Sequence, residues 1–105
     1  MKNPAWNIVC PLDDLAHNDV IGATINDAQI AFVRTNDDRV YAVDAVCTHG
    51  RAMLTDGFVD GVEIECPKHN GRFNVVSGDA VASPARVAIR TYPCRVTNGI
   101  IEVQY

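Results

Sequence analysis

The sequence predicts an all-β domain, and three observations support this prediction. The chain has 105 residues, which is enough for one compact domain and too few for two. The β-branched residues, 14 Val, 8 Ile and 6 Thr, far outnumber the strong helix formers Leu, Lys and Glu, of which there are 3, 2 and 3. Short apolar runs also recur between turn signals every ~8–12 residues, as in small sandwiches and barrels.

The strands are expected in two groups separated by less regular sequence. The first group covers residues 6–10, 20–25, 28–35 and 39–44. The second group covers residues 62–66, 72–76, 87–96 and 100–104. Turns are marked by Asn36-Asp37-Asp38, Ser77-Gly78-Asp79 and Thr97-Asn98-Gly99, and Asn-Gly in particular favours a hairpin. The segment from Leu12 to Ala16 is the one candidate for a helical turn.

Charge and hydropathy exclude several classes of function. The net charge of -4 and the pI of about 5.1 disfavour a nucleic-acid binder, which usually carries a basic face. No apolar run approaches the ~18 residues of a membrane span. The segment Met1-Lys2-Asn3-Pro4 does not open a signal peptide. We therefore expect a cytoplasmic protein with neither nucleic-acid nor membrane partners.

Two short Cys/His pairs carry the candidate chemistry. They are Cys47-Thr48-His49 and Cys66-Pro67-Lys68-His69, and each offers one thiolate and one imidazole. Two such loops can bring four ligands to one point, which is how metal sites are recognised in sequences. Two thiolates and two imidazoles can close a tetrahedral zinc site or hold a [2Fe–2S] cluster. The residues alone leave both possibilities open.

The sequence around these pairs resembles the Rieske [2Fe–2S] proteins. The segment Cys47-Thr48-His49-Gly50 and the run from Cys66 to Phe73 look like the two cluster-binding loops of that family. The resemblance extends over nearly the whole chain and includes Ser77-Gly78 and Pro84. In length and loop sequence the chain is most similar to the Rieske ferredoxins of bacterial aromatic-ring-hydroxylating dioxygenase systems.

The resemblance implies a fold and a role. The fold is a single Rieske domain over residues 1–105, with a β-sandwich base and a small cluster-binding subdomain, about 45–75, at one end. Cys47 and Cys66 would bind one iron of a single [2Fe–2S] cluster, and His49 and His69 the other. The protein would have no catalytic residues. It would carry single electrons from a flavin-dependent NAD(P)H ferredoxin reductase to a terminal oxygenase of aromatic hydrocarbon catabolism, both docking transiently near His49 and His69.

Departures from the respiratory-complex Rieske proteins imply a low reduction potential. Those proteins join their loops by a disulfide at positions where this chain has Ala52 and Lys68. They also place Ser and Tyr hydroxyls near the cluster sulfurs, where this chain has Gly71 and Phe73. Fewer donors stabilise the added electron less, so we expect a potential toward the low end of roughly −150 to +300 mV.

The residue inventory also argues against catalysis. A Rieske oxygenase needs a second iron held by two histidines and a carboxylate, but only His17 remains once His49 and His69 are used. The chain has no Gly-x-Gly-x-x-Gly fingerprint, which argues against a reductase. Two alternatives stay open: a Rieske-like small subunit of a nitrite reductase-type complex, and a zinc-stabilised interaction module.

Several other residues have assignments of their own. Cys10 and Cys94 are interpreted as small buried hydrophobes rather than as a disulfide. By resemblance, Ser83-Pro84-Ala85 is a candidate for a third loop that shields the cluster from water. Close backbone approach or a positive φ is expected at Gly50, Gly57 and Gly71. Steering toward acidic partner surfaces is the hypothesis for Lys68, Arg51 and Arg72.

Overall fold

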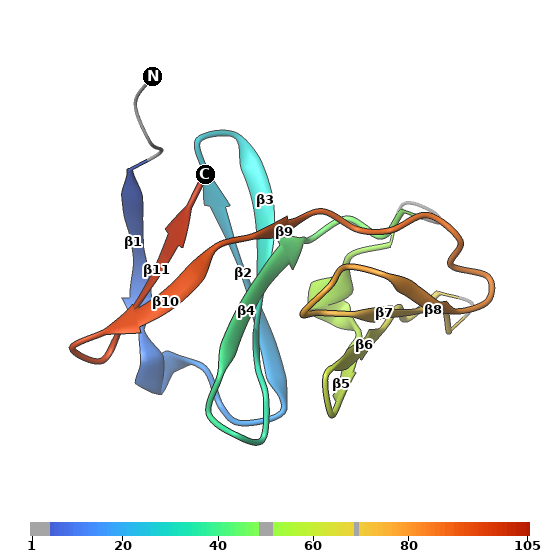
Figure 1. Cartoon of the computed structure of the whole chain (residues 1–105), viewed down its shortest axis with the longest axis horizontal. Coiled ribbons are helices and arrows are strands. Elements are labelled where there is room, and N and C mark those ends of the chain that lie inside the picture. The colour runs from blue at the N-terminus through green and yellow to red at the C-terminus, as the bar shows by residue number, and fades with distance from the viewer. Residues whose placement is uncertain (1–4, 49–51, 69) are drawn as a thin grey trace.

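The computed structural model describes residues 5–48, 52–68 and 70–105, which form three antiparallel sheets (Figure 1). The first sheet has the order β1 (Trp6–Pro11), β11 (Ile100–Gln104) and β10 (Cys94–Thr97). The central sheet has the order β2 (Asp19–Ile25), β3 (Ala28–Arg34), β4 (Val40–Asp44) and β9 (Thr91–Tyr92). The third sheet has the order β5 (Phe58–Asp60), β6 (Glu63–Glu65), β7 (Arg72–Asn74) and β8 (Ala80–Ala82). The expected all-β class is confirmed.

The helical content of the described residues is limited to two 3-10 turns. These are η1 (Leu12–Asp14), which confirms the turn expected after the first strand, and η2 (Leu54–Asp56). No helix in the described parts of the chain is long and apolar enough to cross a membrane.

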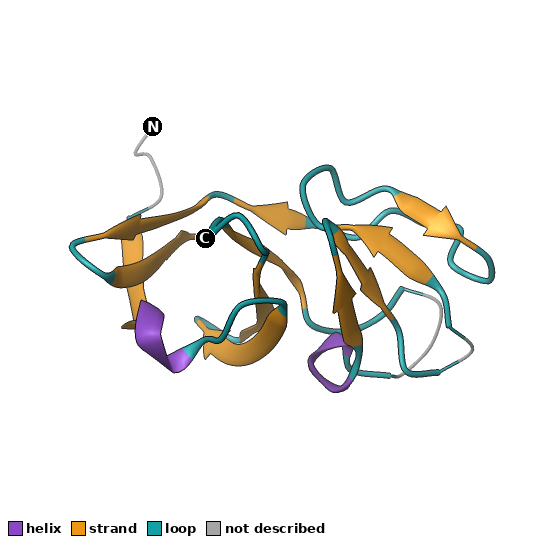
Figure 2. Cartoon of the chain, turned by 90° about the horizontal axis from the view of Figure 1, so that it is seen from below, coloured by secondary structure: helices purple, strands orange, loops and turns teal. Residues whose placement is uncertain are grey.

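Strand β3 of the central sheet is buried on both of its faces. Along β3, Ile30 and Phe32 pack toward the first sheet, whereas Ala31 and Val33 pack toward the third. Side chains of a strand alternate between its two faces, so a strand covered on both sides is apolar throughout. All four residues are 0% exposed. The sheets therefore stack as three layers, which Figures 1 and 2 show from two directions.

The first and central sheets form the expected sandwich base. Strand β11 lies in the middle of the first sheet, and its Ile101 and Val103 point into the base. The buried core between the two sheets consists of Leu15, Ile30, Phe32, Val40, Ala42, Tyr92, Ile101 and Val103.

A second core joins the central sheet to the third sheet. The central sheet contributes Val20, Ala31, Val33 and Val43, and the third sheet contributes Ile64 and Phe73. Cys47 and Cys66 belong to this same core. The third sheet therefore packs the two cluster-loop cysteines against one end of the base.

Most expected strands agree with the observed ones to within one or two residues, but the single strand expected over 87–96 is wrong. Residues 83–90 form no strand, and Pro93 separates the two-residue β9 from β10. Proline has no amide hydrogen and cannot continue a ladder of hydrogen bonds. Strands β5 and β8 have no counterpart among the expected strands.

Candidate metal centre

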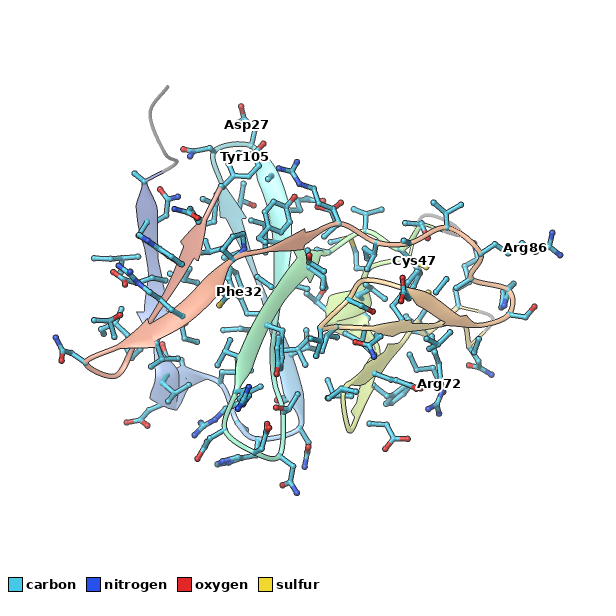
Figure 3. All side chains as sticks on the ribbon, viewed as in Figure 1. Asp27, Phe32, Cys47, Arg72, Arg86 and Tyr105 are labelled. Carbon is cyan, nitrogen blue, oxygen red and sulfur yellow. The ribbon has the colours of Figure 1, made fainter. Side chains whose placement is uncertain are left out.

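The two Cys/His pairs lie in two loops at the end of the base that carries the third sheet. The first loop follows β4, and the amide of Cys47 donates to the carbonyl of Ala52 at 2.9 Å, which folds the loop back on itself. The second loop connects β6 to β7, and the amide of Cys66 donates to the carbonyl of Gly71 at 2.7 Å. Figure 3 labels Cys47 where the central and third sheets meet.

The thiols of Cys47 and Cys66 are buried and adjacent. The two residues are 2% and 1% exposed, neither is in a disulfide, and their thiols are close enough to interact. Burial raises the pKa of the Cys66 thiol because the thiolate would lose its solvation, and Cys47 adds to this effect; the backbone amide of Lys68 opposes it. A metal ion that binds both sulfurs supplies the counter-charge that burial removes. The pair therefore fits the thiolate half of an iron–sulfur site.

The two histidines of the predicted ligand set, His49 and His69, lie outside the described residues. Their neighbours Thr48, Lys68 and Asn70 are all exposed. Within residues 5–48, 52–68 and 70–105, no three His, Cys, Asp or Glu side chains lie close enough to hold a metal ion. The described residues thus contain the cysteine half of the set, and the histidine half stays a prediction.

A third segment, which connects β8 to β9, reaches the cysteines. Ala85 is buried in the same core as Cys47 and Cys66. The hydroxyl of Thr48 donates to the carbonyl of Val87 at 2.8 Å, which ties the first loop to this segment. The expected third loop near Ser83-Pro84-Ala85 is therefore in place, whereas its shielding of the cluster stays a prediction. No signal in the sequence pairs Thr48 with a carbonyl so far along the chain.

Two of the three glycines expected at the site approach other parts of the chain closely, and Gly57 has no room for a side chain. A Cβ on Gly57 would lie 2.1 Å from the carbonyl oxygen of Glu65, and one on Gly71 would lie 3.1 Å from the Cβ of Ala85. Gly57 has a φ of -92°, so a positive φ does not explain the need for glycine at this position. Gly50 lies outside the described residues.

The remaining cysteines and the remaining described histidine lie in the base. His17 pairs with Asp38, with 2.6 Å between Nε2 and Oδ1. Cys10 and Cys94 are free and half-buried, on two strands that flank β11. Burial raises the pKa of Cys94 to about 12, so its thiol stays protonated and is a poor metal ligand. The interpretation of both cysteines as small buried hydrophobes is correct in part: they pack against the base core as free thiols, but they are only partly buried.

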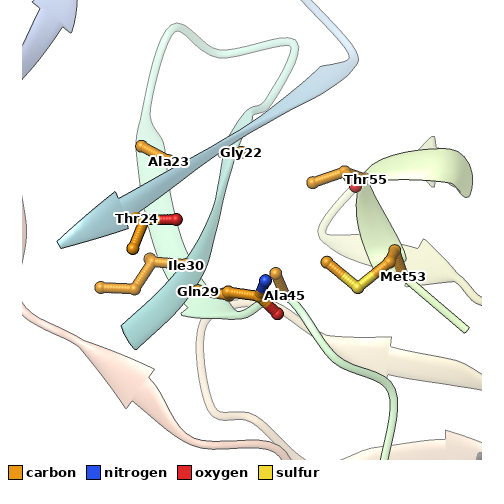
Figure 4. A pocket seen from close by; sticks show the side chains of 8 residues that line it. All are labelled: Gly22, Ala23, Thr24, Gln29, Ile30, Ala45, Met53 and Thr55. Carbon is orange, nitrogen blue, oxygen red and sulfur yellow. The ribbon is translucent and has the colours of Figure 1, made fainter. Parts of the chain in front are cut away.

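A cleft of about 280 Å³ opens between β2 and η2 (Figure 4). Its lining consists mainly of small or apolar side chains: Gly22, Ala23, Thr24, Gln29, Ile30, Ala45, Met53 and Thr55. Strand β2 and η2 approach each other closely here: a Cβ on Gly22 would lie 2.9 Å from Cγ2 of Thr55. Neither Cys47 nor Cys66 lines the cleft, so it marks the seam between layers and is separate from the metal centre.

Comparison with known proteins identifies the family of the chain. A family model described as "Rieske [2Fe-2S] domain" matches residues 5–93. The ferredoxin component of the naphthalene 1,2-dioxygenase/salicylate 5-hydroxylase systems of Ralstonia sp. is 43% identical over 93 residues, which are 89% of this chain and 88% of that relative.

Solved structures give the same fold. A chain in the complex of reduced oxygenase and oxidized ferredoxin in carbazole 1,9a-dioxygenase has a TM-score of 0.88 at 35% identity, covering 97% of this chain and 94% of that one. A protein described as an NADH-dependent nitrite reductase small subunit of Mycobacterium tuberculosis has a TM-score of 0.89 at 27% identity, covering 99% of this chain and 97% of that one. The fold is thus shared by both roles, and the higher sequence identity favours the ferredoxins. The chain belongs to the Rieske [2Fe–2S] family, and within it to the ferredoxin components of aromatic-ring dioxygenase systems, which hold a Rieske [2Fe–2S] cluster and carry electrons to the oxygenase without catalysing the reaction themselves.

Proposed function

We propose that this chain accepts single electrons from a flavin-dependent NAD(P)H reductase and passes them to a terminal oxygenase that hydroxylates an aromatic compound. The observation that supports this most is the adjacent, buried pair of Cys47 and Cys66 in the two loops that match the Rieske motif. When bound, the cluster takes up and releases one electron at a time. The chain would act in the cytoplasm as one domain over residues 1–105, with the cluster-binding subdomain at about 45–75.

The ligand set we propose is Cys47 and Cys66 for one iron, and His49 and His69 for the other. The described residues favour an approach by partners at the tips of the two loops. Behind the cysteines, Ile64 and Phe73 are 0% exposed and belong to the core that contains both thiols. This packing excludes water and partners from the side of the third sheet. The reductase and the terminal oxygenase would therefore both dock transiently near His49 and His69.

The surroundings of the sulfurs support a low reduction potential. The backbone amide of Lys68 favours the thiolate of Cys66 and opposes the rise in its pKa. Phe73 is fully buried and has no hydroxyl, so its side chain offers no further donor to either sulfur. Fewer hydrogen bonds to the sulfurs stabilise the reduced state less. A low potential suits a protein that reduces an oxygenase.

The ligand set is tested by iron and acid-labile sulfide analysis of anaerobically purified protein, with an EPR spectrum after chemical reduction. We expect about two irons and two sulfides per chain, because a Rieske cluster is a [2Fe–2S] centre. The average g value should lie below that of all-cysteine clusters. Replacing any one of Cys47, His49, Cys66 or His69 by alanine should abolish this spectrum.

Matched controls are available in the base. Cys10→Ala and His17→Ala remove the same kinds of side chain outside the proposed ligand set, so both variants should keep the iron, the sulfide and the spectrum of the wild type. One zinc ion per chain and no EPR signal would overturn the proposal. A full complement of iron in His49→Ala or His69→Ala would exclude that histidine as a ligand.

Docking is expected to depend on Lys68. Lys68 is exposed in the second loop, and no salt bridge to it occurs among the described residues. At about 10 Å through water a single charge contributes roughly twofold to an association rate. We therefore expect Lys68→Leu to slow electron transfer to the oxygenase roughly twofold at low ionic strength, with the difference lost in high salt.

The control for Lys68 is Arg39→Leu, which removes one positive charge at the β3–β4 turn, in the base. Arg39→Leu and Lys68→Leu change the net charge of the protein equally. Because Arg39 lies in the base and not in a cluster loop, the rate constant of Arg39→Leu should equal that of the wild type within error. Stopped-flow measurement of oxygenase reduction against ionic strength provides the comparison. Equal salt dependence in the wild type and Lys68→Leu would exclude Lys68 from docking.

A further inference from the structure

The outer face of the third sheet carries a cluster of four charged side chains. Asp60 on β5 pairs with Glu63 on β6, and Glu65 on β6 pairs with Arg72 on β7. Directly paired residues of antiparallel strands point to the same face of a sheet, so the four share one face. Ile64 and Phe73 point to the other face, into the core with the cysteines. In Figure 3, Arg72 lies on the side of β7 away from Cys47.

A single guanidinium binds all three carboxylates. Arg72 reaches Oε1 of Glu65 at 2.8 Å through Nη2 and at 3.0 Å through Nε. Its Nη1 lies 3.2 Å from Oδ2 of Asp60 and 3.3 Å from Oε1 of Glu63. The hydrogen bonds that Arg72 donates to these carboxylates raise its pKa, so the guanidinium stays charged. The cluster therefore has a net charge of minus two, which would become minus three without Arg72.

This pairing changes the interpretation of Arg72. The hypothesis that it steers acidic partners requires a positive charge that is free to act on them. In the structure that charge is committed to Asp60, Glu63 and Glu65, and the cluster as a whole is negative. An acidic partner surface would be repelled by it. Arg72 therefore acts within the chain.

The cluster lies at the base of the second loop. Glu65 directly precedes Cys66, and Arg72 directly follows Gly71, whose carbonyl accepts the amide of Cys66 at 2.7 Å. The Glu65–Arg72 pair thus closes the loop that presents Cys66 and His69. Glu65 and Arg72 therefore flank the loop that contains Cys66, and net charge is one determinant of the potential of an iron–sulfur cluster.

We propose that Arg72 is a positioning residue for electron transfer, which offsets one of the three negative charges of Asp60, Glu63 and Glu65 at the base of the Cys66 loop and thereby raises the reduction potential of the iron–sulfur cluster. Reduction adds a negative charge, so nearby carboxylates that lose their counter-ion oppose it. The inference rests on the proposed function, because it requires that Cys66 be a ligand.

The test compares two variants that change the net charge of the four side chains around Arg72 in opposite directions. Arg72→Gln removes a positive charge, and we expect the midpoint potential to shift to a more negative value. Glu63→Gln removes a negative charge and keeps the side-chain length, so we expect a shift to a more positive value. Added salt should shrink both shifts, because the Arg72 side chain is 33% exposed. The potential is measured by spectroelectrochemistry on protein whose iron content is verified.

Two controls separate charge from structure. Arg72→Lys keeps the charge and loses the forked geometry, so its potential should stay close to that of the wild type. Arg95→Gln removes a positive charge from the Arg95–Glu102 pair on the first sheet, at the opposite end of the molecule, and should leave the potential unchanged.

The outcomes are distinguishable from a failure of the proposed function. Shifts in the same direction for Arg72→Gln and Glu63→Gln, or no shift in either with the cluster intact, would overturn the inference and leave the electron carrier in place. A wild-type protein without iron would overturn the proposed function instead. If Arg72→Gln fails to retain the cluster, the upward shift in Glu63→Gln and the unchanged potential of Arg72→Lys decide the question.

Discussion

Replacing Phe73 by alanine is expected to lower the free energy of unfolding by about 3–5 kcal/mol and to accelerate the loss of iron. Phe73 is 0% exposed and is among the largest fully buried side chains of the chain. Truncation to alanine forfeits the buried apolar surface and leaves a cavity that the surroundings fill only in part. Because Phe73 packs in the core that contains Cys47 and Cys66, the cavity opens beside the proposed ligands.

The matched control is Phe32→Ala, an equal truncation of an equally buried side chain. Phe32 lies in the core between the first and central sheets, away from the core that contains Phe73. Both variants should unfold at lower urea concentration by similar amounts. Iron transfer to a chelator in native buffer should accelerate mainly in Phe73→Ala, since local opening of the third sheet is enough to expose the cluster. If both variants lost iron equally fast, the third sheet would not open separately from the base.

The elements of the base were predictable from local patterns. The run from Ile30 to Val33 is apolar on successive residues because β3 is covered on both faces, and such a run indicates a fully buried strand. Asn98 and Gly99 have φ values of 51° and 76°, which is the conformation that an Asn-Gly hairpin turn requires. Both signals depend only on neighbouring residues.

The errors in strand prediction arose where long-range contacts decide the structure. The segment over 87–90 is rich in β-branched and apolar residues, yet its carbonyl at Val87 accepts from Thr48 and its amide at Ile89 donates to Gly78. These contacts hold the segment against the first cluster loop and the β7–β8 turn, and they take the place of strand pairing. Strands β5 and β8 contain three residues each and, unlike the equally short β6, do not lie in a longer run that alternates between apolar and polar residues.

The metal centre was predictable to the extent that its information is local. The spacing within Cys47-Thr48-His49 and Cys66-Pro67-Lys68-His69 is specific enough to indicate the family, and the structure brings the two cysteines together. The role of Arg72 was not predictable, because its three carboxylates come from β5 and β6 and their pairing depends on the register of the third sheet. A sequence shows which residues are charged, but it does not show which ion pairs they form in the folded protein.

The second large effect is expected at Gly78, where alanine should cost about 2–5 kcal/mol of unfolding free energy, the sum of a conformational and a steric part. Gly78 has a φ of +84°, which side chains with a Cβ rarely adopt. A Cβ there would also lie 2.3 Å from the carbonyl oxygen of Ile89, which is backbone and cannot swing away. In addition, Gly78 accepts the amide of Ile89 at 2.8 Å, so displacement would loosen the third segment from the β7–β8 turn.

Gly99→Ala separates the two contributions. Gly99 has a φ of +76°, close to that of Gly78, but no atom lies within 4 Å of the position its Cβ would take. Gly99→Ala should therefore show only the conformational cost, about 1–2 kcal/mol. Urea denaturation of both variants gives the steric cost as the difference between them. Equal destabilisation would mean that the backbone near Ile89 yields without cost, and that the β7–β8 turn does not hold the third segment in place.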